Sequence, residues 1–80
     1  MQTSDIKELI ENQIEDSEAT VQIEGNHIHL VVVSSAFNGL NTLKKQQLVY
    51  GAVNHLIADG TVHAVHMKTY TPDEWKAENN

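Results

Sequence analysis

The fold is decided by residues 19–33, which read ATVQIEGNHIHLVVV. Two runs rich in β-branched residues, 19–23 and 27–33, flank the turn-forming triplet Glu24-Gly25-Asn26. Strand-forming runs that are separated by a short turn of this composition are typical of a β-hairpin. We therefore predict that the two runs are antiparallel neighbours in one sheet.

A crossover connection follows this hairpin. Residues 34–41 have the composition of a loop, and the apolar residues at helical spacing after them end before the Asp59-Gly60 pair. A third strand is predicted at 61–67. Because a crossover helix joins parallel strands by a right-handed connection, the third strand should lie parallel to the second. The apolar residues of the long helix are Leu43, Leu48, Val49, Ala52, Val53, Leu56 and Ile57.

Two further helices complete the predicted order of elements. A helix over residues 5–15 has one apolar face, and Ser4 is placed to act as its N-cap. The tetrapeptide TPDE at 71–74 combines an N-cap, a proline at the first helical position and a capping-box glutamate, which predicts a short helix that carries Trp75. The apolar face of the first helix comprises Ile6, Leu9, Ile10 and Ile14.

Together these elements predict a single domain over residues 1–80 with the order αββαβα. Its class is α+β, a two-layer sandwich in which a three-stranded mixed sheet carries helices on one face. We expect Leu30, Val53 and Leu56 to lie in a core that is necessarily small in a chain of 80 residues.

Composition excludes several classes of function. The formal net charge is −6, there is no cysteine, and the five basic residues are all lysines. Without cysteine, this chain alone can form neither a disulfide nor a thiolate-ligated metal site. No apolar run exceeds residues 30–33, which argues against a leader peptide or membrane span and predicts a cytoplasmic protein without membrane contact.

Catalysis has little support in the sequence. The four serines lie in no strand–elbow–helix arrangement, and no cysteine nucleophile is available, so we predict that the protein is not an enzyme. A group of carboxylates on and after the first helix is interpreted as a solvated helix face. It comprises Glu8, Glu11, Glu15, Asp16 and Glu18.

Five histidines, at positions 27, 29, 55, 63 and 66, are the feature of the composition that most suggests chemistry. His55 is expected to be solvated. His63 and His66 are three residues apart in the predicted third strand and should point to opposite faces, whereas His27 and His29 share a face but are too few for a closed zinc site. If the second and third strands are parallel, His27 and His63 lie at the same end of the sheet and could complete a site with ligands from a partner.

The segment from Asn41 to Trp75, with the preceding Phe37-Asn38-Gly39, resembles the BolA protein family, and within it the bacterial YrbA/IbaG-like branch. The features that carry the resemblance are F-x-G after the second strand, KKQQ-x-VYG at the start of the long helix, V-H-A-V in the third strand and Y-T-P-x-E-W near the end. The Gly25-Asn26-His27 turn is similar to the family's G-S-H turn. The resemblance implies an αββαβα fold related to class II KH domains.

The resemblance also implies a partner and a cofactor. BolA-like proteins bind monothiol glutaredoxins of the CGFS type and share with them a [2Fe–2S] cluster, whose thiolates come from the glutaredoxin cysteine and glutathione. The family's characteristic histidine corresponds to His63. The family's second ligand comes from a Cys or His in the loop that joins the first two strands. Here that loop is short and has no Cys, and the position on the first strand where related YrbA-like proteins can carry a histidine corresponds to Thr20. We therefore expect His27 to substitute as the second ligand. Alone, the chain would carry no cluster and be a monomer or a weak homodimer.

Two other functions remain open at this point. A KH-like regulator of transcription would bind DNA through Lys44 and Lys45, the only basic pair, but the net charge, the absence of arginine and the missing G-x-x-G clamp disfavour this alternative. DNA binding is therefore expected to be weak. A stress-response interaction module whose partner is unrelated to iron is the third possibility.

Overall fold

A three-stranded sheet of order β1-β2-β3 lies at the centre of the computed structural model, which describes residues 2–79. The elements are α1 (Thr3–Gln13), β1 (Ser17–Glu24), β2 (His27–Ser34), a 3₁₀ turn (Ser35–Phe37), α2 (Thr42–Ala58), β3 (Ala64–Tyr70) and α3 (Pro72–Glu78). β1 pairs with β2 in the antiparallel sense, and Gly25, with a φ of 62°, turns the chain between them. β2 pairs with β3 in the parallel sense. Both strand pairings and the α+β class predicted from the sequence are confirmed.

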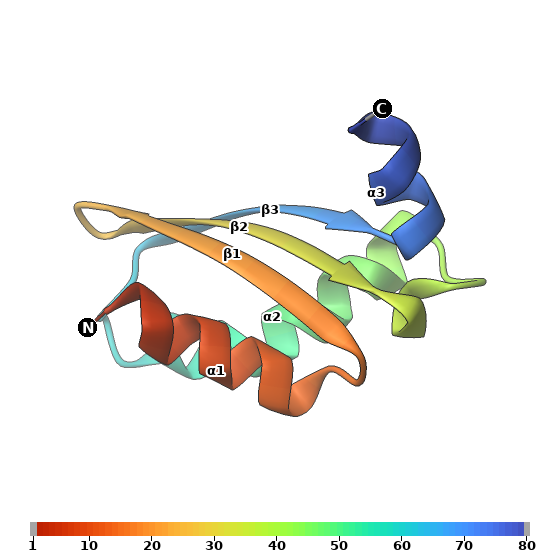
Figure 1. Ribbon diagram of the computed structural model, residues 1–80. Helices are drawn as coiled ribbons and strands as arrows, with labels where there is room; N and C mark the ends of the chain where they lie inside the picture. The colour runs from red at the N-terminus through yellow and green to blue at the C-terminus, as the bar shows by residue number, and fades with distance from the viewer. Residues whose placement is uncertain (1, 80) are drawn as a thin grey trace.

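Helices α1 and α2 form a layer against one face of the sheet, whereas the short α3 stands at the end of β3 and projects away from that layer (Figure 1). Thr71 alone separates β3 from α3, so the chain has no connection long enough to return beneath the sheet. The Trp75 ring instead packs on Tyr70, with ring centroids 5.3 Å apart. One face of the sheet is therefore left largely open.

The core lies between the sheet and the two long helices. Alternate residues of β2 are buried, and the α2 residues Val49, Ala52 and Val53 face them with the i, i+3, i+4 spacing of one helical face. Leu30 and Val53 are core residues as predicted, while Leu56 is only partly buried and packs at the edge of the core. The buried apolar residues are Ile6, Ile10, Ile14, Ala19, Ile28, Leu30, Val32, Phe37, Val49, Ala52, Val53 and Val62.

The predicted apolar stripe of α2 is wrong at two positions. Leu43 and Leu48 are 61% and 43% exposed. The inward helical face continues from Val49 to Lys45, four residues earlier, so that the lysine stem and not Leu48 covers the core edge there.

The start of α1 also differs from its prediction. The helix begins at Thr3 and its N-cap is Gln2, not Ser4, because the Asp5 carboxylate accepts a hydrogen bond of 3.1 Å from the Gln2 backbone N–H. It ends at Gln13, before the tight turn in which Asp16 adopts a φ of 54°. β1 is correspondingly longer than predicted, from Ser17 to Glu24.

Strand β3 begins three residues later than predicted, at Ala64 instead of Thr61. The intervening residues close the connection from α2: the Val62 N–H donates to the Leu56 carbonyl at 3.0 Å, and the Val62 side chain is buried. His63 therefore precedes the strand. The prediction that His63 and His66 both lie in the third strand is therefore wrong.

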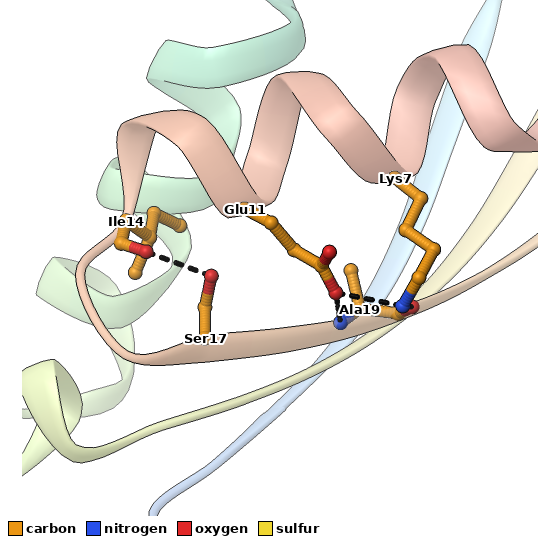
Figure 2. Close-up of polar contacts among 5 residues, drawn as sticks. All are labelled: Lys7, Glu11, Ile14, Ser17 and Ala19. Carbon is orange, nitrogen blue, oxygen red and sulfur yellow. Dashed lines mark hydrogen bonds and ion pairs between the residues drawn. The ribbon is translucent and has the colours of Figure 1, made fainter.

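Side chains of α1 cover the outer edge of β1 (Figure 2). The Lys7 ammonium donates to the Ala19 carbonyl at 2.8 Å, and the Glu11 carboxylate accepts from the Ala19 N–H at 3.0 Å. Lys7 and Glu11 also pair directly at 2.7 Å, and this hydrogen bond, with that from Ala19, lowers the pKa of Glu11. Glu11 is thus a structural residue and not part of a merely solvated face, because it occupies backbone groups that an edge strand would otherwise expose.

Candidate functional site on the open sheet face

Residues of one parity along each strand point away from the helix layer and form the open face. Along β2 the side chains alternate between buried residues and exposed or half-buried ones, which assigns the latter to this face. The register extends the assignment to the paired residues of β1 and β3. The open face comprises Glu18, Thr20, Gln22, Glu24, His27, His29, Val31, Val33, Ala64, His66, Lys68 and Tyr70.

Three histidines meet at one end of this face. The parallel register sets His29 directly beside His66, and their rings stack with centroids 4.6 Å apart and planes 11° apart. The His27 Nδ1 lies 3.3 Å from the His66 Nε2, and these rings are also nearly parallel, with centroids 5.6 Å apart. We call His27, His29 and His66 the histidine cluster. The Glu24 carboxylate lies beside it, 3.9 Å from the His29 Nε2.

His66 is the residue that sequence reasoning missed. The prediction that His27 and His29 share a face is confirmed, but the sequence pattern gave no relation between these two residues and His66. The missing information was the starting residue of β3. Because β3 begins at Ala64, which pairs with His27, the parallel register places His66 opposite His29. A strand that began at Thr61 gave no reason to expect this pairing.

His63 lies just outside β3, at the same end of the sheet. Its backbone N–H donates to the Asn26 carbonyl of the β1–β2 turn at 2.8 Å, and its side chain is exposed. Since the next residue, Ala64, pairs with His27, the prediction that His63 and His27 share one sheet end is confirmed. Within residues 2–79, no three side chains of His, Cys, Asp or Glu are arranged to hold a metal ion together. A metal centre at this end with three or more protein ligands would therefore need ligands from another molecule.

The fifth histidine, His55, lies apart from the others. It is exposed in the last turn of α2, as predicted. Its neighbour Asp59 accepts a hydrogen bond of 2.9 Å from the Thr61 N–H. Hydrogen bonds from Thr61, supplemented by the nearby His55, lower the pKa of Asp59. His55 is therefore an exposed histidine of the helix layer and does not belong to the open sheet face.

The two lysines proposed for DNA binding have different surroundings. Lys44 is exposed, but the Lys45 side chain is only 11% exposed and pairs with the Glu74 carboxylate at 3.0 Å. Hydrogen bonds from the Thr71 backbone and from Lys45 lower the pKa of Glu74. The structure thus uses Lys45 to anchor α3 to α2, which leaves one exposed cation of the pair for a phosphate.

Fold and site together define a small α+β domain of αββαβα order whose open sheet face carries imidazoles at one end. The chain matches the model of the BolA-like protein family over residues 6–74 and belongs to that family. The resemblance noted in the sequence is confirmed. None of the helices in residues 2–79 has the length and apolar character needed to cross a membrane.

Individual relatives are similar over nearly the whole chain. The acid stress protein IbaG of Escherichia coli strain K12 is 39% identical over 75 residues, covering 94% of this chain and 89% of the relative. A solved BolA homologue from Coxiella burnetii has a TM-score of 0.80 at 35% identity, covering 95% of this chain and 97% of that one. The BolA domain of SufE1 from Arabidopsis thaliana has a TM-score of 0.79 at 26% identity, covering 90% of this chain and 93% of that one.

Proposed function

We propose that this protein is a BolA-family adaptor that binds a monothiol CGFS glutaredoxin and shares a [2Fe–2S] cluster with it. His63 supplies the ligand from this chain, and His27 is the candidate for a second. The observation that carries the proposal is the position of His63, which is exposed, fixed through its backbone to Asn26, and at the same sheet end as His27. A ligand for a shared group must be both accessible and held in place.

The ligand atoms that this chain can offer fit a cluster shared with another protein better than a cluster held by this chain alone. No cysteine is available, so this chain can offer imidazole nitrogens but no thiolate. Imidazole replaces thiolate on one iron in some [2Fe–2S] centres and raises the reduction potential there. The thiolates must then come from the partner, which agrees with a glutaredoxin and glutathione as their source.

In this proposal the role of the chain's own residues is to supply a ligand and to bind the partner. The lone pair of the His63 imidazole would supply one ligand to the shared cluster in place of a thiolate. The chain carries out no catalytic step of its own. A relative that is named an acid stress protein supports a stress-response setting for this adaptor.

The direct test mixes the purified chain with a cluster-loaded CGFS glutaredoxin and glutathione, and records visible absorption and circular dichroism. We expect the wild-type chain to change the cluster spectrum and the His63→Ala variant to leave it unchanged. His55→Ala is the matched control, since it removes an exposed imidazole that lies on α2 and not on the open sheet face. Affinity for the cluster-free glutaredoxin should fall much less in His63→Ala, because an interface has many contacts. A wild-type spectrum from His63→Ala would overturn the assignment.

A further inference from the structure

The histidine cluster contains two imidazoles that the proposed function does not use. His66 and His29 lie on adjacent parallel strands whose register holds their Cα atoms side by side, so their proximity does not depend on a flexible loop. His27 opens β2, and its Nδ1 also lies next to the His66 ring, 3.3 Å from the Nε2.

We propose that His27 and His66 form a chelating pair for a divalent transition-metal ion such as Zn²⁺. The distance between the His27 Nδ1 and the His66 Nε2 is 3.3 Å. Zinc–nitrogen bonds of about 2.0–2.1 Å in tetrahedral geometry place two ligand nitrogens about 3.3–3.4 Å apart. The two nitrogens therefore already lie at the separation that the ion requires, on side chains that are both exposed and can adjust to aim at it.

The surroundings favour a borderline cation over other ligands. Imidazole suits zinc, nickel and copper(II), whereas the absence of sulfur disfavours copper(I). His29 stacks on His66 with ring centroids 4.6 Å apart, and the Glu24 carboxylate lies 3.9 Å from the His29 Nε2, so an imidazole and a carboxylate border the pair. The net charge of −6 attracts a dication. Two protein nitrogens with water in the remaining positions make an open, exchangeable site, unlike a closed structural zinc site.

This site is independent of the glutaredoxin partner. The metal site shares His27 with the proposed cluster site, but it needs neither the partner nor sulfide. The second ligand of the metal site is His66, whereas the cluster site uses His63. Loss of one activity without the other therefore separates the two proposals.

The test is calorimetric titration of the tag-free chain alone with Zn²⁺, together with ¹H–¹⁵N spectra that resolve the imidazole nitrogens. We expect one ion per chain, with the largest shifts at the His27 Nδ1 and the His66 Nε2. His66→Ala and His66→Gln should each weaken binding at least about tenfold, since even outer-shell partners of a metal site contribute roughly 10–100-fold to affinity. His55→Ala and His63→Ala should bind as the wild type does.

Three results would overturn the chelating pair. The first is no stoichiometric binding of Zn²⁺ by the wild-type chain, which would leave the 3.3 Å contact as a hydrogen bond between two imidazoles. The second is wild-type affinity in both His66 variants. The third is a loss of binding in His63→Ala alone. Because His66 is exposed, its variants should remain folded, and a melting curve for each confirms this.

Discussion

The two faces of the sheet place different demands on the same strands. On the covered face, Ile28, Leu30 and Val32 are at most 2% exposed and pack against the helix layer. On the open face of the same strand, His27 is exposed, His29 is half-buried, and both lie beside His66 of the neighbouring strand. Burial restricts the covered positions to apolar side chains of suitable volume. At the open positions the strands fix only the distance between neighbouring side chains, and not their chemical type. Side chains with binding roles can therefore accumulate on the open face at little cost to the fold.

The largest effect that tests this difference is expected from Leu30→Ala. Its side chain is 2% exposed on the covered face, and its loss should lower the free energy of unfolding by about 2–5 kcal/mol. Leu56→Ala should be clearly milder, because Leu56 is only partly buried at the edge of the core. Denaturant titration of both variants measures the ranking. A larger loss for Leu56→Ala would show that α2 packs in a different orientation.

A sharper comparison uses two adjacent valines of β2. Val32 is fully buried on the covered face, while Val31 is half-buried on the open face. Val32→Ala removes two buried methyl groups and should cost about 2 kcal/mol, and Val31→Ala should cost well under half of that. Thermal unfolding of the two variants measures this difference in stability, because both substitutions remove the same two methyl groups. Equal losses would indicate that the open face is covered in solution, for example by a second copy of the chain.

Prediction from the sequence succeeded where local patterns decide the structure. The hairpin at Glu24-Gly25-Asn26, the crossover helix and the capping box at Thr71 are each specified by neighbouring residues, and all three are present. The start of β3 depends instead on a contact between residues distant in the sequence, in which the His63 N–H donates to the Asn26 carbonyl. No local pattern contains this contact, so the relation of His66 to His29 could not be found without the structure.

The placement of the candidate site residues was likewise predictable only in part. His27 and His63 at one sheet end follow from parallel strands alone, which the crossover already implies. The partner of Lys45 could not be foreseen, because Glu74 is 29 residues away in the sequence and reaches it only when α3 packs beside α2. Contacts between elements thus decide which of two adjacent lysines is available to a ligand.

A smaller effect is expected at the edge of the covered layer, where Lys7 and Glu11 hold Ala19. The pKa of Glu11 is lowered from its ordinary value of 4.5, mainly by the hydrogen bond from Lys7. Its contribution to stability is therefore present above that value and is lost as the pH falls through the lowered pKa of the folded state. Because the pair is partly exposed, Glu11→Gln should cost no more than about 1 kcal/mol at neutral pH.

The measurement for Glu11 is the free energy of unfolding of wild type and Glu11→Gln as a function of pH. The difference between them should shrink in acid, where the wild-type carboxylate becomes protonated and loses its charge-assisted bonds. A difference that is constant from neutral pH into acid would contradict the role of the charge. It would leave only the neutral hydrogen bond to the Ala19 N–H as the contribution of this side chain.

The smallest expected effect distinguishes Lys45 from Lys44, two adjacent lysines of which one is covered and one exposed. Lys45→Met removes the 3.0 Å contact to Glu74 while keeping the apolar stem against the core, so the melting temperature should drop slightly. Lys44→Met, which alters an exposed side chain, should leave it unchanged. Duplex DNA should bind no tighter than the non-specific range of about 10⁻⁴–10⁻⁶ M at physiological salt, with little change in either variant, since so few cations can neutralise phosphates. Tight DNA binding that Lys44→Met abolishes and Lys45→Met spares would instead make the exposed lysine part of a nucleic-acid site, and the open sheet face would no longer be the principal binding surface.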